Sequence, residues 1–207
     1  MRLPFPVVLA SGSPRRYELL SKIVSDFEVE VSDVDEESLT VEDPWETAQG
    51  LAEAKALAVA DARALRQAPA AIVIGGDTVV ALPGPVMSIQ LAKPMDEDDA
   101  IRMLKFLSGR RHAVITGLAV VSPYGVITSV DTSWVTFREL SELEIRAYVA
   151  SGEPMDKAGS YAIQGGAQRF LEKLEGDIET VVGLSTSMLQ TMLNQVIETL
   201  PPNHLNE

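Results

Sequence analysis

The sequence predicts an α/β fold with a mixed, partly antiparallel sheet flanked by helices and arranged in two lobes. Short apolar runs typical of buried strands alternate with helical patterns along the chain, which indicates strand–helix–strand crossovers. Two strand-like segments are separated only by the turn Ser122-Pro123-Tyr124-Gly125, which indicates a hairpin in the same sheet. Neither a repeat nor a linker divides the 207 residues, so we expect a single domain over residues 1–207.

Local patterns define the elements of the first half. Ser13-Pro14 has the form of a helix N-cap followed by proline at the first helical position. Residues 27–31 alternate between apolar and polar side chains, as a half-exposed strand does. The predicted elements are, in order, a strand at 7–10, a helix from 14, a strand at 27–31, an alanine-rich helix at about 44–65, and a buried strand at 70–74.

The second half continues the mixed pattern. A loop rich in proline and glycine precedes a helix, and Ser141 with Glu144 forms a capping box at the start of another. A loop rich in glycine and glutamine follows Gly159. The predicted elements are a helix at about 96–107, hairpin strands at 112–121 and 126–137, a helix from 141, a short strand near 170–174, a final helix at about 182–199, and a flexible tail at about 200–207.

Acidic residues outnumber basic ones by 30 to 17, but the excess is local. Eleven acids and no base lie between Lys22 and Lys55, whereas the rest of the chain carries 19 acids and 17 bases. Such a run is typical of a solvated surface. Because an acidic surface repels phosphate backbones, we expect no nucleic-acid polymer as a partner.

Composition also limits the compartment and the chemistry. The chain has no cysteine, which excludes disulfides and thiol nucleophiles and is compatible with a reducing cytoplasm. The apolar run near the N-terminus is too short for a signal peptide, and the longer uncharged stretches are too polar or too broken for a membrane span. We therefore expect a cytoplasmic protein that does not associate with a membrane.

Arg15 and Arg16 lie in the first turn of the predicted helix that begins at Pro14. Cations are unfavourable there because free amides and the positive end of the helix dipole occupy the same place. An anion bound at the helix start would explain the pair, and Ser11 among small residues would let a ligand approach the backbone. The alternative is two solvated arginines.

Lys55 lies on the apolar stripe of the predicted helix at 44–65, one turn after Leu51. Lysines at such positions commonly extend from the edge of the core to solvent. The alternative is an ammonium group that points into a polar cleft.

Asp77 follows the predicted strand at 70–74 within Gly75-Gly76-Asp77-Thr78. Ligand sites of open α/β sheets lie beyond the carboxyl ends of strands, where glycines would clear space and a carboxylate could hold Mg²⁺ or orient a water. The alternative is an aspartate that caps a turn. Gln164, before two glycines, could read the edge of a base, although such loops are common.

Several established sites are absent from the sequence. The chain has only two histidines, and it shows no histidine-based metal cluster and no evident Ser-His-Asp set. Neither a Walker P-loop nor a GxGxxG fingerprint occurs. A nucleotide would therefore have to bind by another arrangement.

The motifs, taken together, resemble the Maf nucleotide pyrophosphatases. The resemblance runs from Leu9 to about Leu184, and the joint order and spacing of the motifs make it specific. The matching segments are 9–16, the acidic segment 32–36, Lys55-Ala56, 74–80, Lys93-Pro94, 107–109, 115–117, 153–159 and 163–165.

The resemblance implies a function. It implies hydrolysis of nucleoside triphosphates to the monophosphate and pyrophosphate with a divalent metal cation, Mg²⁺ or Mn²⁺. It also implies a homodimer and a fold of two lobes around a cleft, similar to the inosine triphosphate pyrophosphatases. Arg15, Thr78 and Gln164 match the branch that acts on dTTP and UTP. Modified nucleotides are an alternative substrate class, and a nucleotide-sensing or partner-binding role in cell division is an alternative function.

The resemblance also implies roles for individual residues. Asp77 is the catalytic residue and, with Glu36, the metal ligand. The substrate-binding residues are Ser11, Arg15, Arg16, Lys55, Thr78, Lys93 and Gln164. Three features depart from the family pattern: a longer loop between Asp77 and Lys93, Gly50 in place of a common arginine, and Ser185 in place of proline.

Overall fold

The computed structural model of the protein describes residues 3–84 and 87–199, so the predicted tail at 200–207 lies outside the described residues. The described strands form one seven-stranded sheet in the order β2-β1-β3-β5-β6-β7, with β4 paired to β3. β1 is parallel to β2 and β3, and the other pairings are antiparallel, which confirms the mixed sheet. The strands are β1 (Val7–Leu9), β2 (Glu28–Val29), β3 (Ile72–Leu82), β4 (Ile89–Leu91), β5 (Arg111–Ser122), β6 (Gly125–Phe137) and β7 (Leu171–Glu175).

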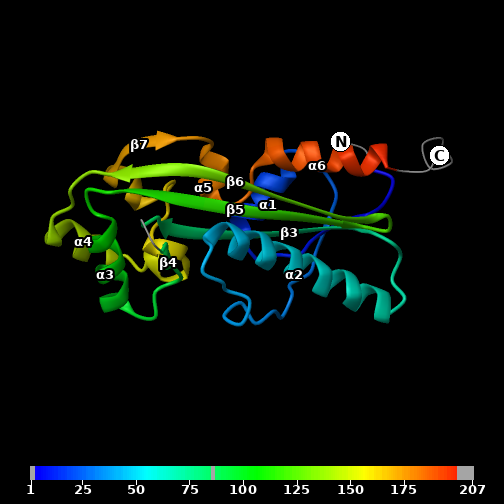
Figure 1. Ribbon diagram of the computed structural model, residues 1–207, viewed down its shortest axis with the longest axis horizontal. Helices are drawn as coiled ribbons and strands as arrows, with labels where there is room; N and C mark the ends of the chain where they lie inside the picture. Colours follow the sequence, from blue (N-terminus) through cyan, green and yellow to red (C-terminus); the bar gives the residue numbers. More distant parts are fainter. Residues whose placement is uncertain (1–2, 85–86, 200–207) are drawn as a thin grey trace.

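Helices cover both faces of the sheet, as Figure 1 shows. α2 (Pro44–Leu65) packs its alanines against one face. On the other face, α1 (Pro14–Ser21), α5 (Ile178–Val182) and α6 (Thr186–Glu198) enclose the larger core with β1, β3 and β5. Asp43 caps the start of α2 by accepting hydrogen bonds from Trp45 N and Glu46 N, and Pro44 begins the helix.

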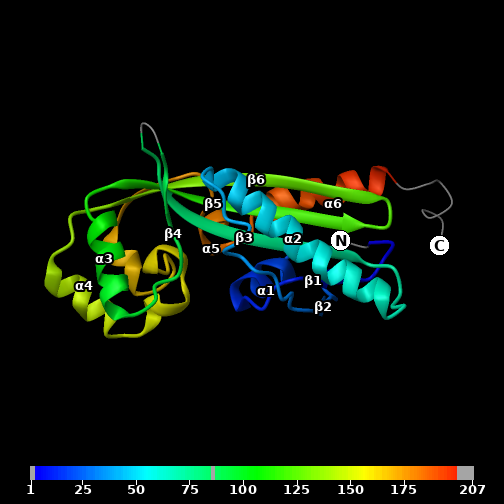
Figure 2. The same ribbon diagram turned by 60° about the horizontal axis from the view of Figure 1, so that its bottom comes forward.

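A second group of elements lies at the end of the sheet where β5 begins and β6 ends (Figures 1 and 2). It consists of α3 (Glu97–Leu107), α4 (Glu142–Val149) and the 3-10 helices η1 (Glu153–Asp156), η2 (Ala158–Ser160) and η3 (Gly166–Phe170). β5 and β6 extend through both groups, so the two lobes share one sheet and need no linker.

Two glycines let α2 approach the sheet closely. A Cβ atom at Gly75 of β3 would lie 2.2 Å from the carbonyl oxygen of Ala52, and one at Gly117 of β5 would lie 2.1 Å from that of Ala48. The helix backbone thus lies directly against the two strands. The expectation that Gly75 clears space for a ligand is therefore wrong, because the space belongs to the helix.

The sequence-based element boundaries fail at three places. The strand predicted at 70–74 does not end before Gly75 but continues to Leu82, because it pairs with β5 along its length. Residues 89–91, predicted as loop, form β4. The final helix, predicted from about 182, begins only at Thr186, where Ser185 caps α6 through Met188 N. Gly183, with a φ of +124°, separates it from the short helix α5, which the sequence did not predict.

The remaining predicted elements are present. The predicted strand at 27–31 is reduced to two residues, and the predicted hairpin and capping box of Ser141 with Glu144 are confirmed. None of the helices within residues 3–84 and 87–199 combines the length and apolar character needed to cross a bilayer.

Candidate active site

Lys55 of α2 joins two carboxylates. Its Nζ atom lies 2.6 Å from Oδ1 of Asp77 and 2.7 Å from Oε1 of Glu36. The Lys55 and Asp77 side chains are 12% and 11% exposed, whereas that of Glu36 is 51% exposed. Of the two alternatives for Lys55, the structure supports an ammonium in a polar site and not one that extends to solvent.

Asp77 reaches this site from the middle of β3, not from a loop beyond the strand. The expectation that it follows the end of a strand is therefore wrong, and the turn-capping alternative does not apply. Its backbone pairs with Gly117 of β5, the glycine that admits α2. The close approach of α2 brings Lys55 within reach of the Asp77 carboxylate.

Glu36 is held by a hydrogen-bonded turn in the acidic segment. The Thr40 hydroxyl donates to the Glu36 carbonyl oxygen at 2.9 Å, and Ser38 N donates to Oδ1 of Asp35. The Gln90 side chain of β4 donates to the Val41 carbonyl oxygen at 2.6 Å, which ties the segment to the sheet. The acidic run is thus mainly a solvated surface, and its residue Glu36 contacts Lys55 in the site.

Charges around Glu36 favour its ionised form. Partial burial acts to raise the pKa of Glu36, but the hydrogen bond and charge of Lys55 outweigh it and lower that pKa. Lys93 and Arg16 lower the same pKa further. The Lys93 charge thus still acts on Glu36 despite the long loop before it, although Lys93 is exposed and no ion pair joins the two within the described residues.

Arg16 occupies a slot formed by three segments of the chain: the turn before α1, strand β3, and the turn after α5. Its Nε donates to the carbonyl oxygen of Gly183 at 2.9 Å, Nη1 to the Ser11 hydroxyl at 3.3 Å, and Nη2 to the Thr78 hydroxyl at 3.1 Å. A Cβ at Gly76 would lie 3.2 Å from Nε, so that glycine makes room for the arginine. Arg16 is therefore a fixed group and not a solvated one.

Burial outweighs the nearby negative charges in its effect on the pKa of Arg16. Burial lowers the pKa of its guanidinium, and the negative charge of Asp77 opposes that effect. Arginine stays protonated in either case. Arg15 next to it is half-buried, and its positive charge contributes to a lowered pKa of Asp156, after the larger effect of Lys157. The Arg15 charge thus acts on a residue of the second lobe.

Gln164 is exposed and lies between η2 and η3 of the second lobe. Its loop is fixed by Glu153, whose carboxylate accepts from the Tyr148 hydroxyl at 3.1 Å and from Gly166 N at 3.0 Å. A Cβ at Gly165 would lie 1.8 Å from Glu153 Oε1. Gly165 and Gly166 therefore allow the loop backbone to lie directly against the Glu153 carboxylate. Within the described residues, no hydrogen bond or ion pair connects Gln164 to the cluster around Lys55.

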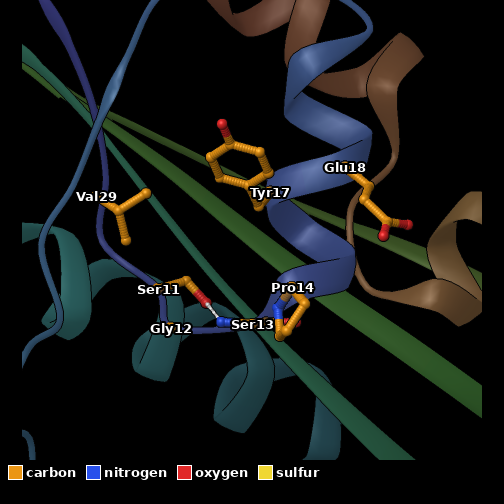
Figure 3. A pocket seen from close by; sticks show the side chains of 7 residues that line it. All are labelled: Ser11, Gly12, Ser13, Pro14, Tyr17, Glu18 and Val29. Carbon is orange, nitrogen blue, oxygen red and sulfur yellow. Dashed lines mark hydrogen bonds between the residues drawn. The ribbon is translucent and has the colours of Figure 1, made fainter.

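An open pocket of about 370 Å³ adjoins the start of α1. In Figure 3 the Tyr17 ring of α1 and the Val29 side chain lie on opposite sides of it, and Ser13 N donates to the Ser11 hydroxyl at 3.2 Å. Pro14 and Glu18 also line the pocket. Ser11 belongs both to this wall and to the Arg16 slot.

The donor set suits a divalent cation in part. Within the described residues, no group of three or more His, Cys, Asp or Glu side chains could hold a metal. Asp77 and Glu36 nevertheless lie close together, because one oxygen of each carboxylate contacts the Lys55 ammonium. The second oxygen of each carboxylate has no hydrogen-bond partner in the described part of the chain. Two hard oxygen ligands fit Mg²⁺ or Mn²⁺, which usually take further ligands from substrate phosphates and water.

Sequence comparison decides the family. A family model of Maf-like proteins matches residues 6–196 of the chain. The chain belongs to the Maf-like protein family. Among relatives of this Maf-like protein is the dTTP/UTP pyrophosphatase of Aquifex aeolicus, which is 44% identical over 92% of this chain and 95% of its own.

Other relatives cover nearly the same span. The dTTP/UTP pyrophosphatase of Geotalea uraniireducens is 48% identical over 86% of the Maf-like chain and 88% of its own. Among solved structures, the Staphylococcus aureus Ham1 protein matches 92% of this chain and 98% of that chain, at 16% identity and a TM-score of 0.45. The family assignment rests on the sequence matches.

Three residues that shape the site were not predicted as site residues in this Maf-like protein. Glu153 holds the Gln164 loop, Gly183 accepts from Arg16, and Thr116 contacts Thr78. Thr116 and Glu153 do lie in the motif segments 115–117 and 153–159, and a threonine within an apolar strand is a further signal, because a buried hydroxyl requires a partner.

Proposed function

We propose that this Maf-like protein is a nucleoside triphosphate pyrophosphatase that hydrolyses dTTP and UTP to the monophosphate and pyrophosphate. The observation that carries the proposal is the Lys55 ammonium between Asp77 and Glu36, next to the fixed guanidinium of Arg16. Relatives of more than 40% identity over most of the chain bear the name dTTP/UTP pyrophosphatase, which supports the same activity and substrates.

Cationic side chains would bind the triphosphate. Lys55, Arg16 and Arg15 come from two helices, and Lys93 lies close enough to Glu36 to affect its charge. A polyphosphate must have its negative charge offset before a nucleophile can approach phosphorus. Ser11, in the turn before α1, would add a hydroxyl beside these cations, since it already contacts Nη1 of Arg16.

Asp77 and Glu36 would also hold the divalent cation. Their carboxylates converge in the structure and keep one oxygen each without a partner among the described residues. When bound, Mg²⁺ or Mn²⁺ would neutralise phosphate charge and make a bound water more acidic.

Asp77 would orient the attacking water and accept its proton. The water oxygen forms a bond to the α-phosphorus, and the bond from that phosphorus to the oxygen shared with the β-phosphate breaks. Pyrophosphate leaves and the proton passes from Asp77 to solvent. Lys55, in contact with Asp77 at 2.6 Å, would keep this carboxylate in place before the attack.

The second lobe would select the base. Gln164 carries an amide with both donors and an acceptor on a loop fixed by Glu153. Thr78 matches the same dTTP/UTP branch, although its hydroxyl contacts Arg16 and Thr116 in the structure. Modified pyrimidine nucleotides with an unchanged base-pairing edge would enter the same site.

We also propose a cytoplasmic homodimer. Free nucleoside triphosphates are a cytoplasmic pool, and the chain contains no cysteine that would indicate an oxidising compartment. Light scattering coupled to gel filtration tests the dimer, since a mass of 22.4 kDa in solution would contradict it.

The activity is tested by assaying pyrophosphate release over a panel of canonical and modified nucleoside triphosphates with Mg²⁺ or Mn²⁺. We expect UTP and dTTP to be the best canonical substrates and the monophosphate to be the second product. In H₂¹⁸O the label should enter the monophosphate and not pyrophosphate, because the α-phosphorus is attacked. Saturable nucleotide binding without turnover would contradict the proposal and favour a sensing role.

A further inference from the structure

Thr116 lies at the centre of a hydrogen-bonded chain behind the candidate active site. It belongs to β5, is fully buried, and faces Thr78 across the β3–β5 pairing. The Thr116 hydroxyl lies 2.9 Å from the Thr78 hydroxyl and 2.7 Å from the carbonyl oxygen of Thr180. Thr78 in turn lies 3.1 Å from Nη2 of Arg16. The chain therefore connects Arg16 to the backbone of α5.

Counting protons fixes the direction of every bond in this chain. A carbonyl oxygen can only accept, so the single hydroxyl proton of Thr116 goes to Thr180. Thr116 must then accept the proton of Thr78. A guanidinium can only donate, so Thr78 accepts from Arg16. Each hydroxyl proton has one destination, and the Thr78 hydroxyl has none left for a ligand.

The same chain contributes to the orientation of Arg16. Three of its five N–H groups are used by Gly183, Ser11 and Thr78. One N–H on Nη1 and one on Nη2 remain for a ligand, which is the fork geometry that suits phosphate oxygens. If Thr116 lost its hydroxyl, Thr78 could turn its proton elsewhere and would no longer be held as an acceptor toward Arg16.

We propose that Thr116 is a positioning residue that acts through the Thr78 hydroxyl to orient Arg16 for the polyphosphate of the substrate. The inference rests on the proposed function, because the polyphosphate is the ligand assigned to Arg16. It gives Thr78 a role in phosphate binding that does not depend on the base.

Inorganic pyrophosphate is the probe that separates these roles, since it has phosphates and no base. We expect Thr116→Val and Thr78→Val each to weaken its binding in calorimetry about tenfold, the loss typical of a hydrogen bond to a charged group. The KM for UTP should rise in parallel. Thr116→Ser keeps the hydroxyl and should bind pyrophosphate nearly as the wild type does.

Ser133→Ala is the matched control for the loss of a buried hydroxyl. Ser133 is also fully buried and donates to a backbone carbonyl, that of Asp177, at 2.7 Å. This variant should lower the melting temperature about as much as Thr116→Val and leave pyrophosphate binding unchanged. Equal weakening of binding in both variants would reveal a general packing effect and overturn the proposal.

A double-mutant cycle tests whether Thr116 acts through Arg16. In an Arg16→Ala background, Thr116→Val should cause no further loss of pyrophosphate affinity. An undiminished additional loss, or wild-type affinity in the single Thr116→Val variant, overturns the inference. If the wild type binds pyrophosphate but hydrolyses no nucleotide, the proposed activity fails while the binding measurements still decide the role of Thr116.

Discussion

The Nζ atom of Lys55 lies 2.6 Å from Oδ1 of Asp77, so a helix cation and a strand carboxylate form one nearly buried ion pair. A buried pair of this kind is a weak source of stability because both groups lose their hydration. Its position next to Glu36 and Arg16 is more readily explained by function, since it places cationic and acidic groups at one point.

Replacing Lys55 by methionine should remove the cation while keeping most of the apolar stem. We expect kcat/KM for UTP to fall about a hundredfold or more, because one electrostatic contact to the reacting phosphate is lost and Asp77 is left unpaired. Steady-state pyrophosphate release measures this. Lys105→Met is the control, since Lys105 is exposed and pairs with Glu142 at 3.3 Å on the surface. Equal kcat/KM values for the two variants would contradict the assignment of Lys55.

Alanine substitutions at two glycines should have opposite effects on stability. Gly75→Ala places a Cβ 2.2 Å from the Ala52 carbonyl oxygen and should force α2 away from β3, which lowers both the melting temperature and the activity. Gly50→Ala meets nothing within 4 Å and lies inside α2, so it should stabilise the fold by about 0.5–1 kcal/mol. Thermal unfolding decides both, and a stabilised Gly75→Ala variant would contradict the close helix–sheet contact.

Removing the Glu153 carboxylate should loosen the loop that carries Gln164. Glu153→Ala deprives the Tyr148 hydroxyl and Gly166 N of their acceptor, so we expect the preference for UTP over CTP to fall several-fold. The ratio of kcat/KM values for the two nucleotides measures this. Glu142→Ala, on the surface of α4, should leave the ratio unchanged. An unchanged ratio in Glu153→Ala would show that the loop does not select the base.

His112 makes stability depend on pH. Burial lowers the pKa of His112 to about 4, whereas the unfolded chain has the ordinary histidine value near 6.5. Between these values the unfolded state binds more protons, so stability falls as the pH falls, by about 1.5 kcal/mol from pH 6.5 to 5. His112→Gln cannot titrate and keeps a polar side chain for the Tyr161 hydroxyl, which lies 2.9 Å from Nε2 of His112. Urea unfolding should show a weaker pH dependence for this variant over that range, and an equal dependence would refute the prediction.

The sequence predicts most of the fold because the relevant signals are local. The proline and cap at the start of α1, the capping box at Ser141 and the alternating hairpin strands each depend on neighbouring residues. The end of β3, in contrast, does not depend on neighbouring residues. Gly75-Gly76 reads locally as the end of a strand, yet pairing with β5 carries the strand on to Leu82. Tertiary contacts decide such positions.

The candidate site also combines features that the sequence predicts with features that only tertiary contacts determine. The family motifs pointed to Lys55, Asp77 and Glu36, and the structure brings all three together. The fixation of Arg16 could not be predicted, because its acceptors Gly183 and Thr78 lie far from it in the sequence. The fixed conformation depends on chain segments that meet only in the folded protein.

The most direct test of the central claim is the turnover of UTP by Asp77→Asn with Mg²⁺ or Mn²⁺. The substitution keeps the size of the side chain but removes the charge that would bind the cation and accept the proton from water. We expect circular dichroism like that of the wild type, and pyrophosphate release reduced by at least about a thousandfold. Release from UTP at the wild-type rate would contradict the assignment of Asp77 and the mechanism built on it.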